Sequence, residues 1–136
     1  MLNFSISELC FSHTAKANNI DNTPKELYIY DNLLNLIFYV LQPIRNKFGI
    51  INISSGYRNK ELNKIVGGVE TSNHLYGCAV DLVPAHASFK QVYDYITTYL
   101  DFDECFIEQN KYGVKWLHVA FRFKNNRKKC NPNFLA

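Results

Sequence analysis

The 136-residue sequence contains no long apolar segment. Its longest uninterrupted apolar run, Leu36 to Leu41, has six residues, whereas a helix that crosses a bilayer needs about 20. The first residues also have neither the basic start nor the apolar stretch of a secretion signal. The sequence therefore predicts no membrane insertion and a protein that is cytoplasmic as synthesised.

Cysteine is scarce, and its spacing is irregular. No C-x-x-C pair occurs among the four cysteines, which are Cys10, Cys78, Cys105 and Cys130. This spacing argues against a disulfide framework and against a zinc site built from thiolates. A chain of this length that is 47% apolar can build one hydrophobic core without such supports. We expect reduced thiols, with Cys78 and Cys105 packed in the interior.

Acidic residues are absent from Arg122 to the end of the sequence. The chain has a formal net charge of +3, and five of its 15 basic residues lie in this final segment. A short basic terminus can contact nucleic acid, anionic lipid or an anionic wall polymer, but a solvated end is the simpler interpretation. We therefore predict a folded domain over 1–123, a basic tail over 124–136, and no nucleic-acid partner.

Helix signals dominate the first third of the chain. Ser5 and Glu8 have the spacing of a capping box, which predicts a short helix from this point. Pro24 follows a cluster of turn formers and predicts the first turn of a long helix, which Pro43 should bend by removing one hydrogen bond. The predicted apolar stripe of this helix comprises Leu27, Tyr30, Leu34, Leu41, Ile44 and Phe48, widened by Leu33, Ile37 and Val40.

Strand signals dominate the rest of the chain. The expected strands are 50–54, 78–83, 105–108 and 115–121, the last two joined by a turn over 110–113. Shorter helices are expected around Leu62 and Ile65, and from a capping box at Ser88 to about Leu100. The sequence thus predicts a single α+β domain, with helices packed on one face of a small, mostly antiparallel sheet.

Two histidines and one aspartate offer metal-binding chemistry. Strand alternation places Asp81 on the face opposite Val80 and Leu82. His74 precedes this aspartate by seven residues, and His118 lies in the last predicted strand. Two imidazoles and one carboxylate suit Zn²⁺ and leave its fourth position to water. A buried, structural Asp–His pair is the alternative, and the spacing alone does not decide between them.

A wider set of motifs carries a resemblance to a known family. In order, the sequence contains Ser55-Gly56-Tyr57-Arg58, Leu62-Asn63, Val66-Gly67-Gly68, Ser72-Asn73-His74, Gly77, Ala79, Asp81 and Trp116-Leu117-His118-Val119. From about residue 4 to about residue 123, the chain resembles the zinc-dependent D-alanyl-D-alanine carboxypeptidase-like peptidases, which share their metal site with the hedgehog signalling domain. This resemblance implies the hedgehog-type fold and one zinc ion bound by His74, Asp81 and His118.

The resemblance also implies roles for residues near the zinc ion. Glu108 is the expected general base, with Asp103 and Glu104 as weaker candidates for that role. A solvated charge is the alternative for Glu108. Arg58 is expected to be catalytic and to bind a substrate carboxylate or carbonyl, a surface salt bridge being its alternative. Ser72 either binds substrate or shapes its own loop.

One position departs from several members of the family. They have a histidine two residues before the last ligand, where this chain has Trp116. Stabilisation of an oxyanion would then depend on zinc and on Arg58. The remaining histidines, His13 and His86, match no motif, and we expect them at the surface.

The resemblance predicts a zinc metallopeptidase that hydrolyses peptide bonds in peptidoglycan stem peptides. It would act as a D-Ala-D-Ala carboxypeptidase or as an L-Ala-D-Glu-type endopeptidase, with a phage endolysin as one setting. A phage protein would reach the host cytoplasm, the periplasm or the virion. We expect a monomer whose only partner is the peptidoglycan peptide. The alternative is a catalytically inactive, zinc-containing module that binds cell wall or belongs to a virion.

Overall fold

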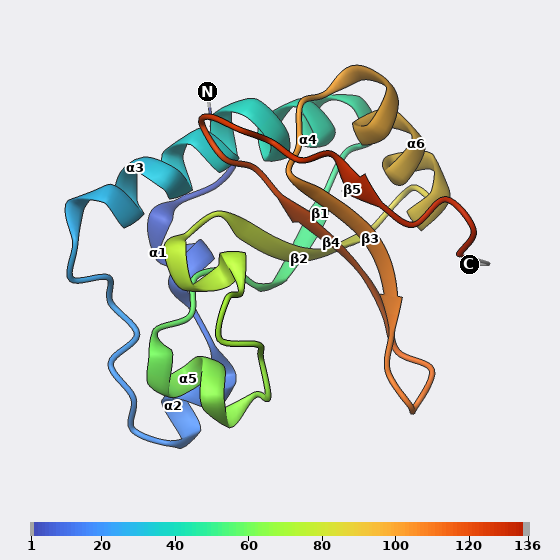
Figure 1. The fold of residues 1–136 in the computed structure, drawn as a ribbon. Coiled ribbons are helices and arrows are strands. Elements are labelled where there is room, and N and C mark those ends of the chain that lie inside the picture. Colours follow the sequence, from blue (N-terminus) through green and yellow to red (C-terminus); the bar gives the residue numbers. More distant parts are fainter. Residues whose placement is uncertain (1, 135–136) are drawn as a thin grey trace.

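The computed structural model describes residues 2–134, and a sheet lies at the centre of the fold (Figure 1). Within these residues the sheet has five strands in the order β1-β2-β4-β3-β5. The pairs are antiparallel except for β3 and β5, which run parallel. The strands are β1 (Ile51–Ser55), β2 (Ala79–Pro84), β3 (Glu104–Gln109), β4 (Lys115–Ala120) and β5 (Lys129–Cys130).

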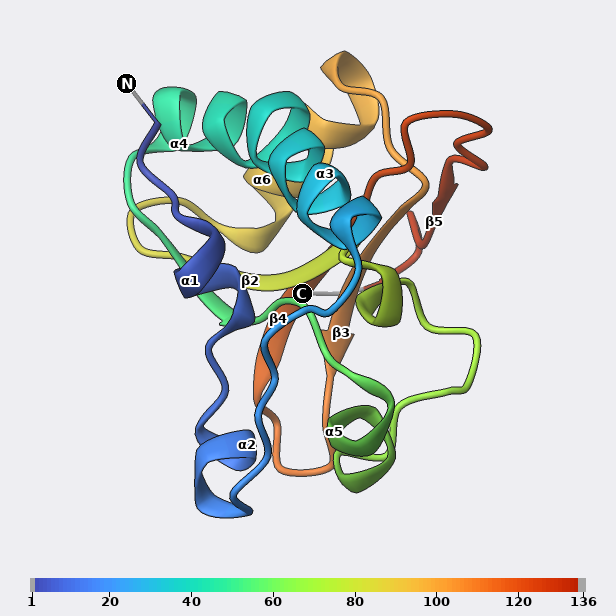
Figure 2. The same ribbon diagram turned by 90° about the vertical axis from the view of Figure 1, so that its left-hand side faces the viewer.

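The longer helices cover one face of this sheet. They are α3 (Leu27–Leu36), α4 (Gln42–Phe48) and α6 (Phe89–Tyr99). Helices α2 (His13–Ala17) and α5 (Lys60–Ile65) lie away from these helices in both views (Figure 2), and the 3₁₀ turn η2 (Asn73–Tyr76) contacts both α3 and α5. The core includes Val80, Leu82, Leu117 and Val119 from the two central strands, all fully buried. The predicted α+β class, with helices on one face of a mostly antiparallel sheet, is confirmed.

The long helix is interrupted just before Pro43, where the sequence predicted a bend. A π-helical turn, η1 (Ile37–Leu41), joins α3 to α4, and the Gln42 N–H donates to the Ile37 carbonyl five residues back. Pro43 follows in the first turn of α4, where its missing N–H and its ring disturb the regular ladder. A wider turn accommodates such a disturbance without ending the helix.

The buried face of this helix differs from the predicted stripe. Leu27 and Leu34 were predicted in the stripe, but they are 83% and 48% exposed. The buried positions are Ile29, Leu33, Leu36, Ile37, Val40, Leu41 and Ile44. The physical reason is the π turn, because one extra residue shifts the phase of a helix by about 100°. A prediction that assumes one regular helical period for the whole segment therefore assigns the exposed face of α3 to the core.

Most other predicted elements are confirmed. Ser5 caps α1 (Ile6–Cys10) by accepting from the Glu8 N–H, and Ser88 and Gln91 form the complete capping box that begins α6. Helix α2, η2 and β5 were not predicted. Strand β5 lies inside the segment predicted as a basic tail, and residues 135 and 136 of that segment lie outside the described residues.

The described residues contain neither a candidate membrane-spanning helix nor a disulfide bond. No helix in 2–134 combines the length and the apolar character that a bilayer crossing requires. The four cysteines are free, and Cys78 and Cys105 are buried as predicted.

Candidate metal centre

The three predicted metal ligands come together on the sheet face that points away from the long helices. Asp81 in β2 and His118 in β4 are direct partners in the antiparallel register. Because side chains alternate along a strand, the burial of their neighbours in the core turns both residues to the opposite face. His74 lies in η2, just before β2. The candidate ligand atoms of the three residues all lie within 4.8 Å of one another.

The Asp81 carboxylate lies between the two imidazoles. Its Oδ1 is 3.1 Å from Nδ1 of His118 and 3.4 Å from Nε2 of His74. Burial raises the pKa of Asp81, but the hydrogen bond with His118 and the charge of that imidazole lower it, and this pKa lies well below its usual range. The carboxylate is therefore ionised and available as a ligand.

A backbone carbonyl fixes the orientation of the His74 ring. Nδ1 of His74 lies 2.7 Å from the Gly56 carbonyl oxygen. Since a carbonyl can only accept, Nδ1 carries the hydrogen and Nε2 presents its lone pair to the centre. That Nε2 is buried and makes no hydrogen bond. Two acceptors, Nε2 and the Asp81 oxygen, thus face each other, which is the arrangement that a bound cation satisfies.

The other ligand histidine is oriented by a carboxylate. Nε2 of His118 lies 2.9 Å from Oε1 of Glu104, so the ring donates there and directs Nδ1 toward Asp81. Burial lowers the pKa of His118, but the hydrogen bonds to Asp81 and Glu104 raise it to about 9. A metal ion that binds Nδ1 must therefore displace a proton near neutral pH. Two imidazole nitrogens and one carboxylate oxygen form a donor set that fits a divalent metal ion.

Glu108 lies on the same face of the sheet, beside the ligands. It pairs in register with Trp116, and the indole Nε1 of Trp116 donates to Oε1 of Glu108 over 3.2 Å. The tryptophan that replaces a family histidine thus holds the carboxylate of the predicted base. Its second oxygen is left for other partners.

Arg58 enters the centre from the end of β1. Ser55, the last residue of β1, is the register partner of Asp81, so the following residues leave the sheet next to this carboxylate. The Arg58 N–H donates to the His74 carbonyl over 3.0 Å. Burial lowers the pKa of Arg58, whereas the charges of Asp81 and Glu108 raise it. Its Nε is buried without a hydrogen bond, which leaves a donor for an incoming acceptor.

Ser72 and Gly77 shape the turn that carries His74. The Ser72 hydroxyl accepts from the His74 N–H over 3.1 Å and caps η2, so the loop-shaping role is the contact that the structure contains. Its contact with substrate stays a prediction. Gly77 ends the turn with a φ of +71°, and a Cβ there would lie 2.9 Å from the Ile29 carbonyl oxygen.

One supporting residue, Asn73, was missed from the sequence, and two acidic residues make contacts that the sequence did not predict. Asn73 donates to Asp103 and to Glu104, over 2.9 and 2.8 Å. The structure places Glu104 on His118 and Asp103 in an ion pair with Arg127, and neither contact corresponds to the base role considered for them. The position of Asn73 beside His74, within the ligand motif, was the available signal.

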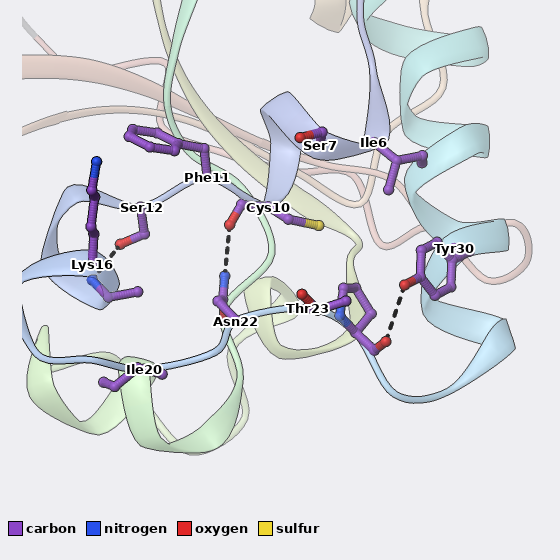
Figure 3. Close-up of a pocket in the computed structure, with 12 residues that line it drawn as sticks. Ile6, Ser7, Cys10, Phe11, Ser12, Lys16, Ile20, Asn22, Thr23 and Tyr30 are labelled. Atoms are coloured by element: carbon purple, nitrogen blue, oxygen red, sulfur yellow. Dashed lines mark hydrogen bonds between the residues drawn. The ribbon is translucent and has the colours of Figure 1, made fainter.

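A pocket away from these ligands lies among α1, α2 and the segment 20–24 (Figure 3). None of the three predicted ligands lines it. At its edge, Nδ2 of Asn22 donates to the carbonyl oxygens of Cys10 and Tyr57, over 3.0 and 2.8 Å. This amide therefore supports the backbone next to Arg58. His13 and His86 are exposed, as predicted.

Comparison with known proteins identifies the family to which the sequence belongs. None of the curated proteins matches the chain. The sequence model of the family described as Peptidase M15 matches residues 2–120. This range covers most of the chain and includes His74, Asp81 and His118, together with Arg58 and Glu108. The chain therefore belongs to the Peptidase M15 family.

Proposed function

We propose that this protein is a zinc metallopeptidase that hydrolyses peptide bonds in peptidoglycan stem peptides. Membership of Peptidase M15 supports the general class, a metallopeptidase with a peptide substrate. The observation that carries the proposal is the buried Nε2 of His74, which makes no hydrogen bond and faces Oδ1 of Asp81 at 3.4 Å. A buried polar atom without a partner is costly. A cation held by His74, Asp81 and His118 removes this cost.

Zinc is the ion that this donor set favours. Imidazole nitrogen together with a single carboxylate is typical of catalytic zinc sites with three protein ligands and one open position. When bound, zinc supplies Lewis acidity and lowers the pKa of water toward neutrality. The residues on the sheet face supply the remaining functions.

Glu108 is proposed as the general base and acid. Its carboxylate takes a proton from the attacking water and delivers it to the leaving amine. The indole of Trp116 engages Oε1, which leaves Oε2 to exchange protons. No covalent bond between the enzyme and the substrate is needed, because water is the nucleophile.

Arg58 is proposed to bind and polarise the substrate. Its guanidinium has a buried, unpaired Nε and can form two parallel hydrogen bonds with a carboxylate, or donate to a carbonyl oxygen. In a carboxypeptidase reaction the acceptor is the terminal carboxylate of D-Ala-D-Ala. In an L-Ala-D-Glu-type endopeptidase reaction the acceptor is an internal carbonyl. The position of the new chain ends distinguishes these two reactions.

The test is incubation of the metal-loaded protein with purified peptidoglycan fragments, followed by mass spectrometry of the products. We expect new peptide ends that disappear when a chelator is added and return with zinc. Release of free alanine identifies the carboxypeptidase, and an internal cut identifies the endopeptidase. The variant Asp94→Asn is a control that should give the same products as the wild type, because Asp94 is an exposed carboxylate on α6, where it pairs with Lys90. Absence of new ends from the metal-loaded protein would contradict the proposed function.

A further inference from the structure

We propose that Glu104 is a positioning residue, which acts through His118 and presents Nδ1 of that ring to the metal ion. The inference rests on the proposed metal centre but not on the identity of the substrate. Glu104 lies in β3, and its side chain approaches the ring edge that is remote from Asp81. It therefore supports a ligand and does not itself reach the metal position.

The contacts of His118 explain why the ring needs this support. Phe106 stacks on the ring, with centroids 5.8 Å apart and planes at 10°. Stacking fixes the plane of an imidazole, but a half-turn about the Cβ–Cγ bond keeps this plane and brings C–H groups to the positions of the nitrogens. The hydrogen bond from Nε2 to Glu104 selects the orientation in which Nδ1 faces Asp81. Partners of this kind on the second nitrogen orient metal-bound histidines.

Asn73 connects this support to the other imidazole. Its Nδ2 donates to Oε1 of Glu104 over 2.8 Å, and Asn73 directly precedes His74 in the chain. One buried amide side chain thus links the residue that orients His118 to the turn that carries His74. Displacement of Glu104 should consequently disturb the geometry of the whole ligand set.

Two arginines from the segment after β4 contact the residues around Glu104. Arg127 donates to both oxygens of Asp103, over 3.0 and 2.6 Å, and its Nη2 lies 3.5 Å from Oε2 of Glu104. Arg122 donates to Oδ1 of Asn73. Strand β5 pairs Lys129 with Glu104 in register. Arg127 directly, and Arg122 through Asn73, therefore support the carboxylate that orients His118.

The experiment compares metal binding by the wild type with that by Glu104→Gln and Glu104→Ala. Affinity is measured by competition with a chromophoric chelator, and ligand geometry by the visible absorption spectrum of the Co²⁺-loaded protein. We expect Glu104→Ala to bind about 10- to 100-fold more weakly and to give an altered Co²⁺ spectrum. Glu104→Gln should bind about 3- to 10-fold more weakly and keep the spectrum, because a neutral amide oxygen still accepts from His118.

Asp94→Asn is the matched control and should bind like the wild type. Circular dichroism shows whether each variant is folded. If Glu104→Ala is unfolded, the metal affinity of Glu104→Gln alone tests the inference. Wild-type affinity in folded Glu104 variants would overturn this inference while leaving the proposed peptidase intact. Absence of metal binding by the wild type would overturn the proposed function as well.

Discussion

Single residues determine which atom of each imidazole faces the metal position. His74 is oriented by the Gly56 carbonyl and His118 by the Glu104 carboxylate. The two rings consequently present different nitrogens, Nε2 and Nδ1, to one oxygen of Asp81. This asymmetry follows from what each remote nitrogen contacts, and a change of either partner should alter metal binding before it alters the fold.

Glu108→Gln should abolish most of the peptidase activity without loss of the metal. A general base contributes about 10²- to 10⁴-fold to a rate, and Glu108 is outside the set of metal ligands. We therefore expect kcat to fall by about that factor, with zinc content by elemental analysis unchanged. Wild-type turnover by this variant would reject Glu108 as the base.

Trp116→Phe should act through the same carboxylate. Loss of the 3.2 Å hydrogen bond from the indole to Glu108 should lower kcat by about 10-fold, the equivalent of about 1.4 kcal/mol. In the Glu108→Gln background the same substitution should have little further effect, because residues that act together are not additive. Independent, multiplicative losses in the double variant would show that Trp116 does not act through Glu108.

The sequence pointed to the three candidate ligands but not to the residues that support them. Strand alternation marked Asp81 and His118 as polar residues among apolar ones, and the family resemblance added His74; the structure brings the three side chains together. The contact between Asn73 and Glu104 joins positions 31 residues apart, and no local pattern encodes it. The contact depends on the register of β3 with β4 and on the position of η2, both of which are fixed by tertiary packing.

At the level of secondary-structure elements, one glycine joins helix α1 to the metal centre. A Cβ at Gly56 would lie 2.1 Å from the Leu9 carbonyl oxygen at the end of α1, and the same oxygen accepts from the Tyr57 N–H over 2.8 Å. The Gly56 carbonyl in turn accepts from His74. The close approach of α1 is thus the reason that the motif has glycine at this position.

Gly56→Ala should destabilise the protein and weaken metal binding together. Overpacking against backbone costs on the order of 3 kcal/mol, and a shift of the Gly56 peptide removes the partner of His74. The control is Gly67→Ala, where a Cβ meets nothing within 4 Å although φ is +77°; it should cost about 1 kcal/mol and leave metal binding unchanged. Equal effects of the two substitutions, by urea unfolding and chelator competition, would contradict this assignment.

Element boundaries were predictable where the signals are local. Capping residues located the starts of α1 and α6, and a short turn located the β3–β4 hairpin. The π turn η1 was not predictable, because proline indicates a disturbance but not an inserted residue. Strand β5 has only two residues, both exposed, and it carries no apolar pattern from which a strand is recognised.

For the molecule as a whole, a bound metal should contribute to stability. A ligand that binds only the folded state at 100 times its Kd adds about 2.7 kcal/mol, which raises the Tm of a domain of this size by about 10 °C. We expect a chelator to lower the Tm by this amount in the wild type but not in His74→Ala. An unchanged Tm in the wild type would indicate that no ion is bound.

The stability of the metal-free protein should fall in acid through Asp103. Burial raises the pKa of this carboxyl, but hydrogen bonds from Arg127 and Asn73 lower it from 3.8 to about 2. A depressed pKa contributes stability above the unfolded value, and this contribution is lost as the pH falls from about 4 to about 2. Urea unfolding in this range should show a steeper loss for the wild type than for Asp103→Asn. Parallel curves would exclude this origin.

The separation of the ligands along the chain has a kinetic consequence. Asp81 and His118 are 37 residues apart, and the intervening chain contains α6 and β3, whereas β2 and β4 are paired strands. Because closing this loop costs conformational entropy, we expect β4 to pair with β2 late in folding, so that an early, partly ordered chain offers an ion only His74 and Asp81. Zinc should accordingly leave the refolding rate unchanged and lower the unfolding rate, because all three ligands can bind the ion only after the transition state for folding.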